Sequence, residues 1–110
     1  MRESRRRNTL TAMLVVIARY RALPGRGDDV AALLGPHIAA TRAEPGCVSF
    51  VVNRAAEDGD RFVLHEQYDD EAAFQAHRES RHFQDYVLGG VVPLLAEREW
   101  ERYTLVDPPV

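Results

Sequence analysis

Residues 47–68, CVSFVVNRAAEDGDRFVLHEQY, contain two stretches rich in Val and Phe on either side of an acidic segment with one glycine. β-Branched and aromatic residues favour strands. The intervening Glu57-Asp58-Gly59-Asp60 is typical of a hairpin connection. This stretch therefore predicts an antiparallel hairpin with strands at residues 47–55 and 61–68.

The segment before the hairpin predicts a strand followed by a helix. Residues 13–23, MLVVIARYRAL, begin as an apolar run and end in alternation, as a buried strand does. After a Pro-Gly turn, Asp28 or Asp29 provides an N-cap or a first-turn acid for a helix that ends at Glu44-Pro45-Gly46. One face of this helix carries Val30, Leu33, Leu34, His37, Ile38 and Thr41. Pro36 lies inside the helix and predicts a bend there.

The segment after the hairpin predicts the same two kinds of element in reverse order. Three acids at residues 69–71 begin a short helix, and a second helix is expected from Ser80 to about Leu95. Residues 98–106 then alternate well enough for a last strand. The order βαββαβ is that of a ferredoxin-like α+β fold, a four-stranded antiparallel sheet with helices on one face. The strand at 47–55 has apolar residues at both parities, so its second face also needs cover, which a partner subunit could supply.

Length and charge limit the class of protein. A chain of 110 residues is expected to form one domain, here residues 13–107, with a flexible leader at 1–12 and a short tail at 108–110. The net charge is −3, and the leader alone carries +3, which leaves the rest acidic. An acidic surface is unsuited to nucleic acid, so no nucleic-acid partner is expected. No segment approaches the roughly twenty apolar residues of a membrane span, so no membrane partner is expected either.

The chain has a single cysteine, Cys47, and no cofactor motif. One cysteine cannot form an intrachain disulfide, which favours the reducing cytoplasm. There is no phosphate-binding loop, dinucleotide fingerprint or nucleophile elbow. Any oxidation is therefore expected to proceed without a flavin or nicotinamide domain in this chain.

Three of the four histidines lie within residues 65–82, which raises the possibility of a metal site. Two histidines on one helix face need a spacing of three or four residues, whereas His77 and His82 are five apart, about 140° around an ideal helix. His65 and Glu66 are neighbours on a strand and point to opposite faces. The spacing therefore argues against a metal site, unless a bend at Ser80 brings His77 and His82 together.

Alternation along residues 61–68 separates the side chains of that strand into two sets. Phe62, Leu64, Glu66 and Tyr68 share one face, and Val63, His65 and Gln67 share the other. A glutamate among apolar side chains is desolvated, and this raises its pKa unless a cation pairs with it. Glu66 is thus either an acid–base group or a packing residue paired inside the fold. His65 is expected to pack at a partner interface.

The other histidines are candidates for a base near neutral pH. His77 and His82 lie close in sequence to the strand that carries Glu66, and His37 on the first helix also faces inward. Either His77 or His82 could serve as the base, and either could instead bind a backbone carbonyl at a helix end. The sequence does not choose between them.

Two motifs resemble the antibiotic biosynthesis monooxygenase family. The first is Glu66-Gln67-Tyr68-x-x-Glu71-x-Ala73, and the second is Ala76-His77-x-x-Ser80-x-His82-Phe83-x-x-Tyr86. MLVVIARYRALPG and Glu44-Pro45-Gly46-Cys47 resemble further landmarks of the family, so the resemblance spans about residues 13–107. It looks nearest to the quinol monooxygenase and autoinducer-2 phosphate isomerase branches.

The resemblance implies a homodimeric α+β barrel with a pocket between sheet and helices in each subunit. Many members oxidise hydroquinones or polyketides with O₂ and without metal or flavin, so the resemblance implies no cofactor and a small-molecule substrate. Such a reaction needs a base, a polar group for the developing oxyanion and an apolar wall. The catalytic candidates are Glu66, His77 and His82, and the substrate-binding candidates are His37, Tyr68, Phe74, Phe83 and Tyr86.

The sequence also departs from parts of the family. Cofactor-free polyketide oxygenases have Asn, Trp and Tyr at the positions of Leu64, Tyr68 and Phe74, so their polar set is missing here. Heme-degrading members have an Asn and a ligating His near Ala18 and Val87, which argues against heme oxygenation. Three functions stay open: a cofactor-independent monooxygenase of a quinol or phenolic compound, an isomerase of a small carbonyl compound, and a non-catalytic ligand-binding dimer.

Overall fold

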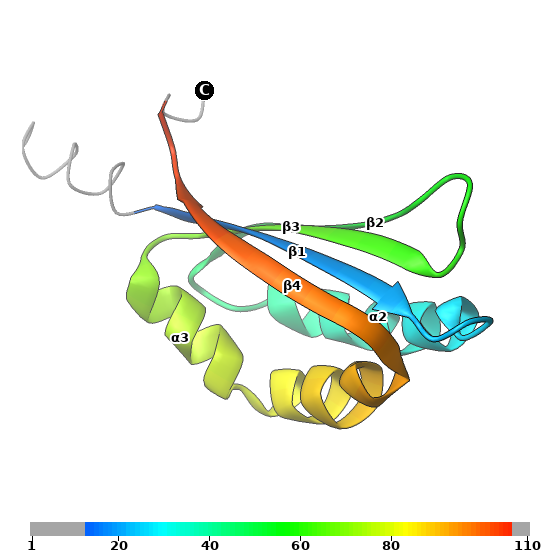
Figure 1. The fold of residues 1–110 in the computed structure, drawn as a ribbon. Helices are drawn as coiled ribbons and strands as arrows, with labels where there is room; N and C mark the ends of the chain where they lie inside the picture. Colours follow the sequence, from blue (N-terminus) through cyan, green and yellow to red (C-terminus); the bar gives the residue numbers. More distant parts are fainter. Residues whose placement is uncertain (1–12, 107–110) are drawn as a thin grey trace, which may run out of the picture.

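The computed structural model describes residues 13–106, which form one sheet with all the helices against a single face (Figure 1). The expected leader at 1–12 and the tail at 108–110 lie outside the described residues. The strands are β1 (Leu14–Ala22), β2 (Cys47–Arg54), β3 (Arg61–Tyr68) and β4 (Leu95–Thr104). The helical elements are α2 (Gly27–Arg42), α3 (Glu71–Glu79), a π-helix η1 (Phe83–Val91) and a 3₁₀ turn η2 (Val92–Leu94).

The sheet has the order β2-β3-β1-β4, and all its neighbouring strands are antiparallel. β1 and β3 therefore form its centre. In the register, Glu66 of β3 lies opposite both Val16 of β1 and Phe50 of β2. The predicted ferredoxin-like α+β fold and the predicted hairpin are confirmed.

One face of the sheet packs on the helices and forms the core. On β3 the buried residues are Phe62, Leu64, Glu66 and Tyr68, as the alternation predicted. On α2 the buried positions Val30, Leu34, His37 and Thr41 follow the predicted stripe. α2 is a single helix through Pro36, so the expectation of one helix is confirmed, and the bend at Pro36 stays a prediction.

Two predicted elements after α3 are wrong in type or bounds. The helix expected from Ser80 to Leu95 contains a π-helix and a 3₁₀ turn. Gly89 and Gly90 lower the preference for α-helix there, and Pro93 has no N–H for an α-helical bond. The last strand begins at Leu95 instead of residue 98 and ends at Thr104, because its pairing with β1 extends back to Ala22 opposite Leu95.

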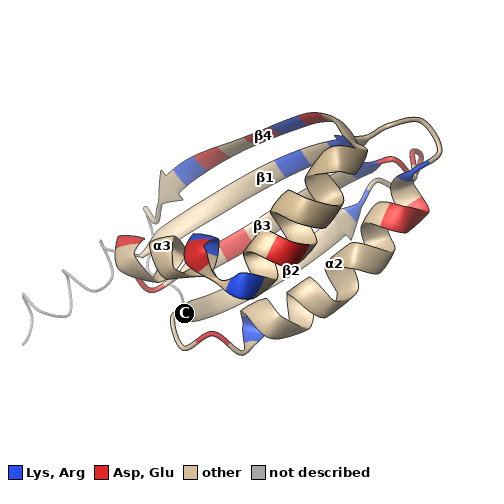
Figure 2. Ribbon diagram, turned by 90° about the horizontal axis from the view of Figure 1, so that it is seen from below, with Lys and Arg blue, Asp and Glu red and all other residues tan. Residues whose placement is uncertain are grey.

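The other face of the sheet carries no helix (Figure 1). Val51, Val63 and Tyr103 are large side chains on this face that are exposed by 42%, 38% and 42%. The edge strand β4 alternates acidic and basic residues along its length (Figure 2), which disfavours pairing with another edge. In residues 13–106, no helix combines the length and the apolar character that crossing a bilayer requires.

Gly46 brings the end of α2 into close contact with α3. A Cβ atom on Gly46 would lie 2.4 Å from the Cβ of Ala73, which is far shorter than a van der Waals contact. The carbonyl of Gly46 also accepts a 2.9 Å hydrogen bond from the amide of Asp69, just before α3. Gly46 therefore holds the segment that contains Glu44 against α3.

We expect Gly46→Ala to lower the free energy of unfolding by about 1–3 kcal/mol through overpacking. Ala73→Gly removes the clashing atom, so it should cost less in the Gly46→Ala background than in the wild type. Urea unfolding of the four proteins of this double-mutant cycle measures the coupling. Additive effects of the two substitutions would contradict the contact.

Candidate functional site

A small cavity lies between the centre of the sheet and the helices α3 and η1. Its volume is about 30 Å³, close to the space of one water molecule. It is lined by Val16, Ala18, Tyr20, Glu66, Phe74, His77, Arg78, Phe83, Arg98 and Trp100. The lining combines aromatic walls with one carboxyl, one imidazole and two guanidinium groups, which is the composition of a site for a planar, ionisable ligand.

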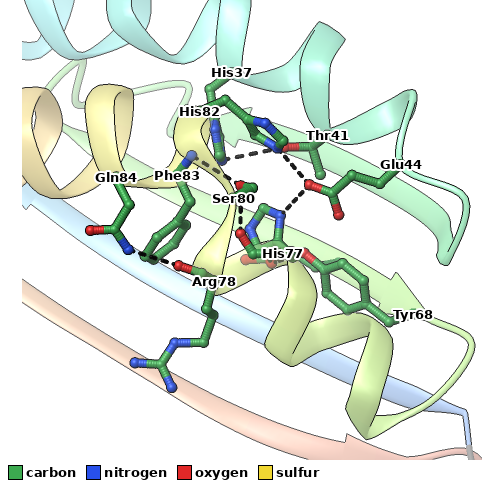
Figure 3. Close-up of polar contacts among 11 residues, drawn as sticks. His37, Thr41, Glu44, Tyr68, His77, Arg78, Ser80, His82, Phe83 and Gln84 are labelled. Atoms are coloured by element: carbon green, nitrogen blue, oxygen red, sulfur yellow. Dashed lines mark hydrogen bonds and ion pairs between the residues drawn. The ribbon is translucent and has the colours of Figure 1, made fainter.

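His77 is held from behind by a carboxylate. Its Nδ1 lies 2.8 Å from Oε2 of Glu44 (Figure 3). Its Nε2 lies 4.0 Å from Oε1 of Glu66, which also lines the cavity. An ionised carboxylate only accepts hydrogen bonds, so the proton of a neutral His77 sits on Nδ1. The Nε2 lone pair is then free and faces the cavity. Burial lowers the pKa of His77, and the hydrogen bond to Glu44 offsets part of this effect.

The same oxygen of Glu44 binds a second histidine. Nε2 of His82 lies 2.5 Å from Oε2 of Glu44 (Figure 3). The side chains of Glu44 and His82 are 15% and 19% exposed, whereas that of His77 is only 2% exposed. His82 is therefore on the outer side of this cluster, away from the cavity lining.

His37, on α2, is the third histidine of this cluster. Its ring centroid lies 5.4 Å from those of both His77 and His82. Its Nε2 lies 3.4 Å from Oγ1 of Thr41, and its buried Nδ1 has no hydrogen-bond partner among residues 13–106. Burial, followed by the neighbouring His77 and His82, lowers the pKa of His37 to about 3. His37 is therefore neutral in any ordinary buffer.

Glu66 is the second titratable group at the cavity. It is 6% exposed, and its Oε1 accepts a 2.6 Å hydrogen bond from the hydroxyl of Tyr68. Burial raises the pKa of Glu66 to about 7, and the hydrogen bond from Tyr68 opposes this rise. Glu66 therefore exchanges a proton near neutral pH, as expected for a carboxyl on the apolar face of β3.

A bend at Ser80 creates this arrangement. Ser80 has an extended backbone (φ −66°, ψ 152°), which ends α3. Its hydroxyl donates to the carbonyl of His77 at 2.6 Å and accepts from the amide of Phe83 at 3.2 Å. The bend brings His77 and His82 together. A spacing of five residues argues against a common metal ion only on one straight helix, so it does not argue against one here. Glu44, His77 and His82 have ligand atoms within 4.8 Å of one another.

The predicted site residues divide into three groups. Glu66, Phe74, His77 and Phe83 line the cavity. Tyr68, His37 and His82 lie behind the lining, where they contact Glu66, the ring of His77 and Glu44, respectively. Tyr86 is half-buried on η1 and is not part of the lining. His65 is exposed on the opposite face of β3, as its parity predicted.

Several residues of the site were not singled out from the sequence. Neither the helix end nor the Glu44-Pro45-Gly46-Cys47 motif indicated that the Glu44 carboxylate contacts His77 and His82. Arg98 and Trp100 come from β4, where the register places them opposite Tyr20 and Ala18. The alternation of β4 was the available signal, since it puts Arg98, Trp100 and Arg102 on one face.

Comparisons with known proteins agree with this fold. The family model described as antibiotic biosynthesis monooxygenase matches residues 13–88. A Mycobacterium tuberculosis protein named "Putative monooxygenase Rv0793" is 39% identical over 77 residues, which cover 70% of this chain and 75% of that protein. Its structure has a TM-score of 0.81 at 32% identity and covers 89% of this chain and 99% of that one. A structure named "Putative antibiotic biosynthesis monooxygenase from Nitrosomonas europaea" has a TM-score of 0.83 at 25% identity, with 89% and 94% covered.

The pKa of Glu66 has a consequence for stability. Between pH 4.5 and 7 the native protein holds a proton on Glu66 that the unfolded chain has lost, so this group lowers the free energy of unfolding as pH rises. Glu66→Gln removes the titration and keeps an acceptor for Tyr68. We expect the free energy of unfolding of the variant, relative to that of the wild type, to rise by roughly 2–3 kcal/mol from pH 5 to pH 8. Urea unfolding at both pH values measures this, and a pH-independent difference would contradict it.

Proposed function

The chain belongs to the antibiotic biosynthesis monooxygenase family, and on this premise we propose that it oxidises a quinol or related phenolic compound with O₂, without metal or flavin, using His77 as the base. The observation that carries the proposal is the 2.8 Å contact between Glu44 and Nδ1 of His77, because it assigns the ring proton to Nδ1 and leaves Nε2 as the acceptor in a residue that lines the cavity. The sequence left the choice between His77 and His82 open. The position of His77 at the cavity favours it as the base.

The first step is removal of a phenolic proton. A carboxylate that binds one ring nitrogen of a histidine orients the ring, so that the other nitrogen can accept a proton from a bound hydroxyl. Because burial lowers its pKa, His77 is neutral and able to accept at neutral pH. Proton transfer leaves a phenolate, which is rich enough in electrons at a ring carbon to react with O₂.

The later steps need a cation and an acid. Arg98 and Arg78 both line the cavity and can stabilise the phenolate oxygen. O₂ adds to the activated ring carbon as a hydroperoxide, which loses water to form a quinone. The net reaction converts the phenol and O₂ into the quinone and one water. His77 returns its first proton to the peroxide and then takes the hydrogen of that ring carbon. Glu66, with a pKa of about 7, gives a proton to the departing hydroxide and regains it from His77, whose Nε2 lies 4.0 Å away.

The cavity must open for such a substrate. A volume of about 30 Å³ is far below the roughly 300 Å³ or more of a typical ligand pocket. The guanidinium of Arg78 lies 5.3 Å from the ring of Trp100 and 5.9 Å from that of Phe74, and Trp100 is 36% exposed. We propose that Arg78 and Trp100 move apart to admit the substrate and then close over it to exclude water.

A second candidate is an isomerase of a small carbonyl compound. Glu66 and His77 form a pair of acid–base groups 4.0 Å apart in a buried cavity, which suits the transfer of a proton between two carbon atoms. This reaction needs no O₂. A non-catalytic ligand-binding dimer would use the same cavity without turnover.

We also propose a cytoplasmic homodimer joined through the helix-free face of the sheet. Val51, Val63 and Tyr103 are exposed there, beside Val15 and Ile17 of β1, and a partner would bury them. A second chain on this face would also bury the exposed side chain of His65. A monomeric mass by light scattering at micromolar concentration would contradict the dimer.

We expect His77→Gln to lower O₂ uptake with a reduced naphthoquinone or an anthrone by about 10²- to 10⁴-fold, because glutamine cannot act as a base. The matched control is His65→Gln on the opposite face of the sheet, which should keep the wild-type rate. An oxygen electrode measures both variants. A wild-type rate equal to buffer would exclude the oxygenase, and exchange of substrate protons with D₂O without O₂ would then support the isomerase.

A further inference from the structure

We infer that Glu44, His77 and His82 form a binding site for one divalent ion of the zinc class, and that the bound ion removes the free base of His77. The first half concerns binding alone and is independent of the proposed function. The second half rests on the proposed function, because it concerns the base of that reaction.

The donor atoms suit such an ion. Oε2 of Glu44, Nδ1 of His77 and Nε2 of His82 lie within 4.8 Å of one another. Two imidazoles and one carboxylate are a common three-ligand set for zinc, with bonds of about 2.0–2.2 Å and an open fourth position. Ligands in a tetrahedral site then lie roughly 3.3 Å apart. The two contacts of Glu44, 2.8 and 2.5 Å, are hydrogen bonds and must lengthen by less than about 1 Å. The two ligand nitrogens, at most 4.8 Å apart, must approach each other by up to about 1.5 Å.

The three ligands are fixed by their backbone. The amide of Glu44 donates to the carbonyl of Thr41 at 3.0 Å, and its carbonyl accepts from the amide of Cys47 at 3.1 Å. The Ser80 hydroxyl holds the bend between His77 and His82 by hydrogen bonds on both sides. A site held in this way loses little conformational freedom on binding an ion, which favours affinity.

A second observation comes from His37. Its ring lies 5.4 Å from those of both histidine ligands, and its buried Nδ1 has no partner in the described part of the chain. Buried polar atoms without partners are rare in native proteins, so we expect a further polar group near this nitrogen. A water on the fourth position of the ion is a group of that kind.

The ion would act on the base through the ring of His77. Binding at Nδ1 displaces the proton from that nitrogen, and a neutral imidazole then carries its proton on Nε2. Nε2 becomes a donor and can no longer accept the proton of a substrate. Neither Glu44 nor His82 lines the cavity, so the ion lies behind the ring and away from the substrate. This position makes the ion an inhibitor and not a centre for O₂ chemistry.

Titration of the metal-free protein with Co²⁺ and Zn²⁺ tests whether the ion binds. We expect one ion per chain by calorimetry, with the visible absorption of tetrahedral Co²⁺. Glu44→Gln and His82→Gln should each weaken binding at least tenfold, whereas His65→Gln should bind like the wild type. His82 is on the outer side of the cluster, so its variant keeps the contact between Glu44 and His77 and is expected to fold. No binding at millimolar ion, or equal binding by the His82 and His65 variants, would overturn the site.

Two readouts test the second half. Zn²⁺ should abolish O₂ uptake and a chelator should restore it, while the His82→Gln variant should need at least tenfold more Zn²⁺. The proton shift in His77 is visible by ¹⁵N NMR whether or not the protein turns over, so loss of the proposed function would not conceal it. Bound Zn²⁺ that leaves the Nε2 of His77 unprotonated would overturn this half.

Discussion

One oxygen atom, Oε2 of Glu44, lies within hydrogen-bond distance of two imidazoles and thereby orders the whole site. The contact with Nδ1 fixes both the tautomer and the ring orientation of His77. Its effect depends on burial, because a carboxylate with little exposure to water interacts more strongly with its neighbours than one at the surface. Without Glu44, the buried His77 would lose the one hydrogen-bond partner that Nδ1 has among residues 13–106, and the direction of its lone pair would no longer be set.

The fold brings these groups together from distant parts of the chain. Glu44 follows α2, His77 belongs to α3, and His82 follows the bend at Ser80. The close approach of Gly46 to Ala73 holds the first of these segments against the second. The sheet supplies the opposite wall, where alternation on β3 turns Glu66 toward His77. The site is therefore a layer between sheet and helices, and its chemistry depends on how these two layers pack.

Local patterns predicted most of the fold. The strict alternation of residues 61–68 was enough to predict both the bounds of β3 and the burial of Glu66. The stripe on α2 predicted that His37 faces inward. Patterns failed where long-range contacts decide the structure. The start of β4 depends on pairing with Ala22. In the π-helix, besides the weak helix preference of its glycines, Gly90 lies against Leu33 of α2, where a Cβ would be 3.2 Å from the Leu33 methyl groups. A bend at Ser80 that brings His77 and His82 together was foreseen as a possibility, but the part of Glu44 could not be predicted, because it lies more than thirty positions from His77 in the sequence.

Through its contact with Nδ1, Glu44 holds His77 as the Nδ1–H tautomer with a free Nε2. ¹⁵N NMR of histidine-labelled, metal-free protein near neutral pH measures this directly. We expect a protonated Nδ1 and an unprotonated Nε2 for His77, and loss of this preference in Glu44→Gln. A proton on Nε2 in the wild type, or an unchanged tautomer in the variant, would contradict it.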